Sequence, residues 1–215
     1  MAGLPKIPPY DPPTAAELAA ARGPWRLDRD RAALLIHDMQ GYFTRAFAPD
    51  AAPLAPVIAH IAALAQACRV AGVPVFYTAQ NGDQDRRDRG LQADLWGPGM
   101  RHIPEDQQII PALAPQPGDQ VLVKHRYSAF QMSNLDHMLR VRGRDQLMIT
   151  GIYAHIGCLM TAAEAFQRDI QPFAIADAQA DFTRAEHDMA MHWVAGRCGV
   201  ALTAADALAV IGGRA

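Results

Sequence analysis

Cysteine is scarce in this chain, with only Cys68, Cys158 and Cys198 among 215 residues. An odd number of widely spaced cysteines supports neither a disulfide framework nor a zinc ribbon, and it suits a reducing compartment. The chain also lacks any apolar run near the roughly 18 residues that cross a bilayer. Its first residues, MAGLPKIPPYDPP, lack the apolar core of a signal peptide. We therefore expect a cytoplasmic protein that does not engage a membrane.

A surplus of basic charge is missing as well, because 20 Lys and Arg residues face 22 Asp and Glu residues. A nucleic-acid-binding protein would show a basic stripe, so we expect no nucleic-acid partner. Half of the residues are hydrophobic, which is enough for one substantial core in a chain of this length. We expect a proline-rich arm with a short helix over residues 1–25 and one domain over residues 26–215.

Apolar runs typical of buried strands alternate with segments of helical period. The patterns predict strands at 31–40, 74–80, 119–124, 146–150, 172–181 and 200–202. They predict helices at 14–22, 54–72, 134–141, 159–169, 183–196 and 204–210, with Thr183 and Glu186 in capping-box spacing. This alternation predicts a three-layer α/β/α fold with a mostly parallel sheet. Residues 81–117 show no clear period, and so long an irregular stretch is usually functional.

Polar residues stand where three of the predicted strands end. Asp38 follows the first strand, Lys124 ends the third, and the turn at residues 151–157 follows the fourth. A single charged residue at a strand end is usually just solvated. Because the carboxyl ends of parallel strands share one edge of the sheet, where open α/β folds bind ligands, the three together predict a site there.

Several segments resemble the isochorismatase-like hydrolase superfamily, and the resemblance covers almost the whole chain. They are LLIHDMQGYF, YTAQNGDQDRRDRGLQADLWGPGM, KHRYSAF, GIYAHIGC and ADAQADFTRAEH, in chain order. In the amidases of the superfamily the turn ends in a nucleophilic cysteine, in a pattern like G-x-A-T-D-x-C-V. Here that position holds Gly157, and Cys158 comes one residue later, turned by about 100° on a helix. The second strand lacks the Asp-Trp-His segment that carries metal ligands in nicotinamidases. The resemblance is therefore to the isochorismatases of siderophore and phenazine biosynthesis, with no thioester, metal or other cofactor.

This resemblance implies hydrolysis of a vinyl ether without a covalent intermediate. Such an ether is protonated at its terminal carbon, and water traps the resulting cation, so one general acid suffices. By family position Asp38 is that acid, and burial among apolar neighbours should hold it partly protonated. Lys124 would orient Asp38 and bind the substrate. Gly157 would leave space where the amidase sulfur lies, with its backbone N–H facing the substrate.

The resemblance also implies the residues that hold the substrate. Gln80 and Arg89 would anchor its carboxylates, and Arg89 suits bidentate binding. Tyr153 would donate its hydroxyl to the ligand, while Phe43 and Trp96 would enclose the ring. Taken singly, a loop arginine is usually solvated and an aromatic residue is usually core. His155, inside the turn, is expected to hold the turn's shape through a backbone hydrogen bond, and the turn often contains a non-proline cis peptide in this superfamily.

The substrate stays open between isochorismate and 2-amino-2-deoxyisochorismate, which share the ether and differ at one ring substituent. The chain ends at Ala215 without a carrier domain, which favours the amino substrate and the product trans-2,3-dihydro-3-hydroxyanthranilate. The alternatives are a siderophore-type isochorismatase, an amidase that uses Cys158 and, least favoured, a non-catalytic partner of a carrier protein. We expect a homodimer in which the arm, residues 4–13, embraces the neighbouring subunit.

Overall fold

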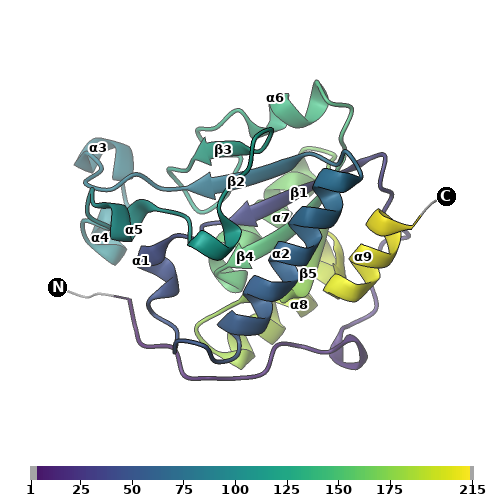
Figure 1. Cartoon of the computed structure of the whole chain (residues 1–215), viewed down its shortest axis with the longest axis horizontal. Coiled ribbons are helices and arrows are strands. Elements are labelled where there is room, and N and C mark those ends of the chain that lie inside the picture. Colours follow the sequence, from purple (N-terminus) through teal and green to yellow (C-terminus); the bar gives the residue numbers. More distant parts are fainter. Residues whose placement is uncertain (1–3, 214–215) are drawn as a thin grey trace.

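Six parallel strands form a single sheet at the centre of the computed structural model, which describes residues 4–213 (Figure 1). In chain order they are β1 (Ala32–His37), β2 (Val75–Ala79), β3 (Gln120–Val123), β4 (Gln146–Ile152), β5 (Gln171–Ala180) and β6 (Val200–Leu202). Their order across the sheet is β3-β2-β1-β4-β5-β6. The predicted α/β fold is confirmed, and every pairing in the sheet is parallel.

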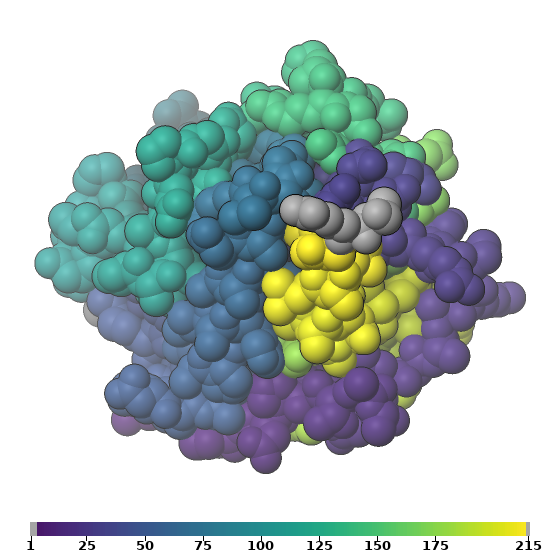
Figure 2. All heavy atoms as spheres, turned by 45° about the vertical axis from the view of Figure 1, so that its right-hand side comes forward, coloured from purple at the N-terminus to yellow at the C-terminus, as the bar shows by residue number. Residues whose placement is uncertain are grey.

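Helices cover both faces of this sheet. The first face carries α2 (Leu54–Val70) and α9 (Ala204–Gly212), which lie side by side in front of the strands in Figure 1. The second face carries α6 (Leu135–Arg140), α7 (Leu159–Gln167) and α8 (Arg184–Arg197). Figure 2 shows α9 between α2 and the N-terminal segment. Each helical layer packs on its own apolar cluster, so the sheet is buried on both sides.

Strand β1 shows how the sequence builds the two clusters. Leu34 and Ile36 face the α2–α9 layer, whereas Ala33 and Leu35 face the α6–α8 layer, because successive side chains of a strand point to opposite faces. The chain moves outward from β1 to β2 and β3, and then returns to place β4 on the other side of β1. The strand order therefore reverses between β1 and β4, which is the point where doubly wound sheets form a ligand-binding crevice.

The stretch from 81 to 117 is more regular than predicted. It contains α3 (Arg86–Arg89), α4 (Gln92–Trp96), α5 (Pro104–Gln107) and a 3₁₀ turn, η2 (Pro111–Leu113), and another short helix, α1 (Gly41–Thr44), follows β1. The buried Gln40 ties this stretch to the sheet. Its side-chain amide donates to the carbonyl oxygens of Gln80 (2.8 Å) and Gln107 (2.7 Å), and it accepts the Gln80 N–H (2.7 Å).

The N-terminal segment differs from its prediction at the expected helix. The helix predicted at 14–22 is wrong, because only the 3₁₀ turn η1 (Ala15–Glu17) forms there, with no buried residue. Two residues of the arm contact the body of the domain in the described chain, which begins at residue 4. Ile7 is buried and pairs with Phe47, and the Tyr10 hydroxyl accepts the Asp181 N–H at 2.7 Å. The homodimer stays a prediction.

Among the described residues, no helix combines the length and the apolar character needed to cross a membrane.

Candidate active site

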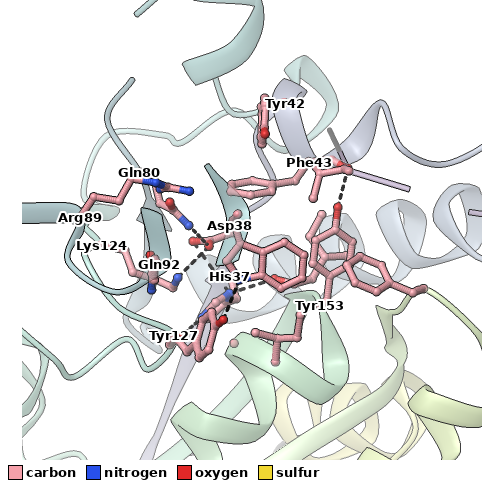
Figure 3. Close-up of a pocket in the computed structure, with 16 residues that line it drawn as sticks. His37, Asp38, Tyr42, Phe43, Gln80, Arg89, Gln92, Lys124, Tyr127 and Tyr153 are labelled. Carbon is pink, nitrogen blue, oxygen red and sulfur yellow. Dashed lines mark hydrogen bonds and ion pairs between the residues drawn. The ribbon is translucent and has the colours of Figure 1, made fainter. Parts of the chain in front are cut away.

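The carboxyl ends of four neighbouring strands meet in one pocket at the β1–β4 reversal (Figure 3). Asp38 follows β1, Gln80 follows β2, Lys124 follows β3, and the turn at 153–157 follows β4. The pocket brings together all eight residues that the sequence singled out: Asp38, Phe43, Gln80, Arg89, Trp96, Lys124, Tyr153 and Gly157. Their individual roles stay predictions.

Asp38 and Lys124 form a buried ion pair, with 2.9 Å between Nζ and Oδ2 and exposures of 4% and 3%. The other oxygen of Asp38, Oδ1, accepts a hydrogen bond from the Thr78 hydroxyl at 2.7 Å, and Oδ2 also accepts the Gln80 side-chain amide at 3.0 Å. Asp38 has a left-handed backbone with φ of 50°. Such a conformation is uncommon outside glycine and is often found at functional sites.

The charge balance around Asp38 differs from the prediction. Burial acts to raise the pKa of this carboxyl, but the Lys124 ammonium and the hydrogen bonds from Lys124 and Thr78 outweigh it and lower the pKa. The expectation that burial holds Asp38 partly protonated is therefore wrong, because the neighbouring groups favour the ionised carboxylate more than burial opposes it.

Arg89 brings a second positive charge into the pocket. Its guanidinium is buried, with the residue 6% exposed, and Nε donates to the Gly97 carbonyl oxygen at 2.6 Å. Burial lowers the pKa of Arg89, yet an arginine stays charged in proteins. Within residues 4–213 no carboxylate forms an ion pair with Arg89. The remaining guanidinium donors therefore suit an anion from outside the chain.

Aromatic side chains form one wall of the pocket. The Tyr153 and Phe182 ring centroids lie 4.4 Å apart, and Phe182 also meets Trp96 edge-on at 6.4 Å. The hydroxyl of Tyr153 donates to the Phe43 carbonyl oxygen at 3.0 Å. The proton of this hydroxyl is therefore engaged within the chain, and its donation to a ligand stays a prediction. Tyr153 also contributes its ring to the wall.

The turn after β4 begins later than predicted. The strand continues through Gly151 to Ile152, the Ile152–Tyr153 peptide is cis, and one turn of π-helix spans Ala154–Cys158. Gly151 has φ of 102°, and a Cβ there would overlap the carbonyl oxygen of His37. Only glycine therefore lets β4 approach β1 this closely.

Gly157 does not leave an empty space. The ring of His37 lies directly against it, and a Cβ on Gly157 would overlap Cε1 of that ring. The predicted vacancy is therefore wrong, since His37 fills the volume of the missing side chain. His37 is buried, with Nδ1 3.0 Å from the Ile152 carbonyl oxygen and Nε2 3.3 Å from that of Tyr127.

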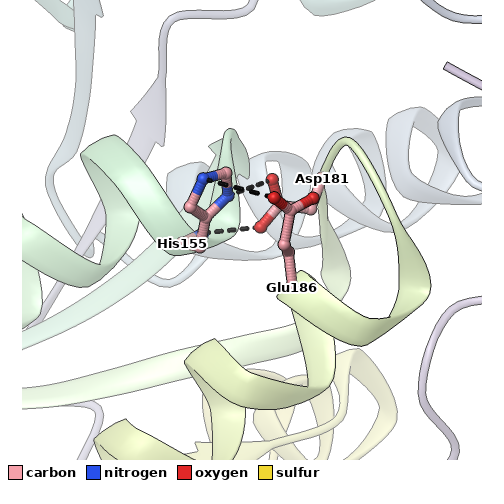
Figure 4. Close-up of side chains that lie close together, drawn as sticks. All are labelled: His155, Asp181 and Glu186. Atoms are coloured by element: carbon pink, nitrogen blue, oxygen red, sulfur yellow. Dashed lines mark hydrogen bonds and ion pairs between the residues drawn. The ribbon is translucent and has the colours of Figure 1, made fainter.

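Behind the turn, His155, Asp181 and Glu186 bring together the atoms that commonly bind metals (Figure 4). The buried Asp181 carboxylate accepts the His155 Nδ1–H at 2.6 Å, the His155 backbone N–H at 2.6 Å and the Phe182 N–H at 2.8 Å. Glu186 lies 3.9 Å from His155 Nε2. These bonds engage both oxygens of Asp181, so the cluster fixes the turn to the end of β5. His155 thus has a structural role, with a carboxylate as its side-chain partner where a backbone group was expected.

The comparisons with known proteins agree with this geometry. The model of the isochorismatase domain matches residues 32–206. The chain belongs to the isochorismatase family. It is 51% identical to a protein named isochorismatase from Bacillus subtilis over 91% of this chain, and it spans 62% of that relative's length. It is 48% identical to the phenazine biosynthesis protein PhzD of Pseudomonas fluorescens, covering 94% of this chain and 97% of that one. The fold resembles a cysteine hydrolase structure from Pseudomonas syringae, with a TM-score of 0.80, 28% identity and coverage of 90% and 97%.

In this isochorismatase-family chain, Cys158 is poorly placed as a substitute nucleophile. Its thiol is buried, does not line the pocket, and lies 3.9 Å from the Thr150 carbonyl oxygen. Burial raises the pKa of the thiol well above its usual range, which suppresses the reactive thiolate. The structure therefore gives no support to an amidase that uses Cys158.

Eight further residues line the pocket, and the sequence analysis did not assign them to it. Seven lie within the segments that carry the isochorismatase resemblance, so a closer reading of those segments would have found them: His37, Tyr42, Gln92, Tyr127, Ile152, Ile156 and Phe182. Leu4 comes from the arm, and no local pattern signals it, because only the tertiary fold brings the arm to the pocket.

Proposed function

We propose that this chain hydrolyses the vinyl ether of 2-amino-2-deoxyisochorismate and of isochorismate, releasing pyruvate. The observation that carries the proposal is the buried Asp38–Lys124 pair in a pocket that also holds Arg89. Among the described residues that line this pocket, none is a cysteine. The set suits acid chemistry on an anionic substrate and offers no thiol for covalent attack.

The reaction needs a proton at one carbon and a water molecule at the next. Asp38 transfers its proton to the terminal methylene carbon of the ether, which becomes the methyl group of pyruvate. The resulting oxocarbenium ion adds water, and the hemiketal breaks its bond to the ring oxygen, which takes up a proton. The ring keeps its own oxygen, and Asp38 stabilises the cation once it has become a carboxylate.

The substrate itself supplies the conditions for protonating Asp38. Both candidate substrates carry two carboxylates, and negative charge beside a carboxyl raises its pKa. The aromatic wall of Phe43, Trp96 and Tyr153 excludes water and strengthens this effect. Asp38 thus takes up a proton as the two carboxylates of the substrate enter the pocket.

Arg89 and Lys124 provide the positive charge that a dianion needs. The Arg89 Nε is held by Gly97, which fixes the plane of the guanidinium and leaves its terminal amino groups to bind one substrate carboxylate. Lys124 lies beside Asp38 and reaches the ether end of the substrate. Gln80 donates to Asp38 and keeps the carboxyl aimed into the pocket.

The test is a paired assay of pyruvate release from the two substrates, run in H₂¹⁸O and in D₂O. We expect a single deuterium in the methyl group of pyruvate and no ¹⁸O in the ring product. Incorporation of ¹⁸O into the ring would show attack at the ring carbon and would overturn the proposed route. Failure to release pyruvate from either substrate would overturn the proposed activity.

A second candidate is hydrolysis of isochorismate alone, favoured by the 51% identity to the Bacillus subtilis protein named isochorismatase. The same assay separates the two, because this candidate requires kcat/KM for the amino substrate to be negligible.

A further inference from the structure

The ring of His37 occupies the place where the side chain of residue 157 would begin. A Cβ at Gly157 would overlap Cε1 of His37 and would lie only 2.8 Å from Nε2 and 3.0 Å from Nδ1. Carbon and nitrogen atoms in favourable van der Waals contact lie about 3.5–4.0 Å apart. The histidine at 37 and the glycine at 157 are therefore sterically matched.

The His37 ring cannot move aside cheaply. It is 1% exposed, and the backbone of His37 pairs with Thr78 of β2 on one side and with Gly151 of β4 on the other. Burial lowers the pKa of His37 to about 4, so the ring is neutral and carries one N–H. The shorter of its two contacts, from Nδ1 to the Ile152 carbonyl oxygen at 3.0 Å, is the natural place for that proton.

The same ring links two parts of the active site. Its Nδ1 faces Ile152, just before the turn, and its Nε2 faces Tyr127 in the segment that follows Lys124. His37 also precedes Asp38 directly in the chain. A single buried side chain thus touches each segment that supplies Asp38, Lys124 or Gly157.

We propose that His37 is a positioning residue that determines which chemistry the pocket supports, by filling the volume in which a nucleophile at position 157 would have to lie. The inference rests on the proposed function, because it explains why this pocket acts through a carboxyl. A thiol introduced at 157 meets the His37 ring, and it becomes usable only when that ring is removed.

The first test is a double-mutant cycle between the two positions. Gly157→Ala should lower Tm by about 5 °C beside His37, because overpacking a core is costly. In the His37→Ala background the same change should leave Tm within about 1 °C. Equal losses of Tm in both backgrounds would overturn the proposal.

The second test measures the reactivity of an introduced thiol towards iodoacetamide, mapped by mass spectrometry. The native cysteines are buried, so their labelling should be slow. Gly157→Cys alone should label slowly. The double variant His37→Ala/Gly157→Cys should label at least about tenfold faster, at a rate close to that of Ala114→Cys, which places a thiol at an exposed position. Equal rates for the single and double variants would contradict the proposal. If Gly157→Cys does not fold, the alanine cycle decides alone.

His37→Asn separates volume from hydrogen bonding. The shorter amide can still donate near Ile152, but it lacks the Cε1–Nε2 edge that meets residue 157. We expect His37→Asn to tolerate Gly157→Ala and to retain more kcat on isochorismate than His37→Ala, with KM within about twofold. Equal kcat values for the two His37 variants would show that the contact positions nothing. The melting and labelling measurements need no substrate, so they stand or fall independently of the proposed activity.

Discussion

At the residue scale, two opposing effects act on the pKa of Asp38. Its burial favours the neutral carboxyl, and the Lys124 ammonium at 2.9 Å favours the carboxylate. A buried ion pair contributes little net stability, but removing one partner leaves the other charge uncompensated. Under the proposed function, Lys124 therefore sets the pH at which Asp38 takes up a proton.

Replacing Lys124 by Met tests this control. The pKa of Asp38 should rise, because burial then acts unopposed by the ammonium. At neutral pH the variant should lose about 3–5 kcal/mol of unfolding free energy. This loss should shrink as the pH falls, because the folded state then binds the extra proton. Carboxyl ¹³C titration and urea unfolding measure both effects.

The exposed Lys6 offers the matched control, since Lys6→Met makes the same substitution at a lysine that lies outside the pocket. A loss that is equal at pH 4 and pH 7 in Lys124→Met would contradict the account of the pair.

Arg89→Lys tests whether the guanidinium binds a substrate carboxylate through two bonds. The charge stays but the fork is lost, so we expect KM for isochorismate to rise about 10–100-fold, with a smaller change in kcat. The exposed Arg87 lies two residues away, and Arg87→Lys should leave KM unchanged. An unaltered KM in Arg89→Lys would show that the carboxylate is held elsewhere.

At the element scale, the ends of the strands could be predicted because a buried parallel strand is a continuous apolar run, and a charge that interrupts it is conspicuous. Asp38 and Lys124 were found in this way. The short helices α3, α4 and α5 were not, because four or five residues are too few to show a helical period. The helix expected at 14–22 has good local propensity, but a single short helix is marginal without a packed face.

Some contacts in the site cannot be predicted from local sequence patterns. The contact between His37 and Gly157 joins residues 120 positions apart and depends on how closely β1 and β4 approach. The engagement of the Tyr153 hydroxyl by Phe43 likewise depends on the path of α1. Residue identity could suggest that Gly157 replaces a nucleophile, but only the fold shows what occupies the space.

The arm should depend on Tyr10 for its attachment. The hydroxyl accepts the Asp181 N–H and lies 3.1 Å from His187 Nδ1, whose Nε2 meets the Ala176 carbonyl oxygen. Tyr10→Phe leaves two buried polar atoms unpaired, so we expect a loss of about 1–3 kcal/mol in unfolding free energy by urea titration. Lys6→Ala, on the exposed side of the same arm, should cost almost nothing. A Tyr10→Phe protein as stable as its parent would show that the Tyr10 hydroxyl does not hold the arm.

At the scale of the whole molecule, stability should fall as the pH drops below about 6.5. Burial lowers the pKa of His187 to about 4, and it also lowers the pKa of His37 to about 4. Between these values and about 6.5 the unfolded chain binds more protons, so stability is lost as pH falls through that window. Each group contributes up to about 1.4 kcal/mol per pH unit there.

His155 acts in the opposite direction. Burial lowers its pKa, but the hydrogen bond and charge of Asp181 outweigh burial and raise it, so its contribution is lost as pH rises. Urea unfolding of His187→Gln at several pH values separates these groups. The variant should show a shallower loss of stability between pH 6.5 and 4, and an unchanged slope would contradict this assignment.

The fold as a whole followed from pattern: alternating strands and helices, two buried faces and a site at the carboxyl edge of the sheet. The central claim is that one carboxyl in this pocket delivers the proton. Its most direct test is Asp38→Asn, compared with the parent for pyruvate release and for isochorismate binding. We predict that kcat falls about 10²–10⁴-fold or more, while Kd changes by only a few-fold. Near-normal turnover by Asp38→Asn would contradict the claim.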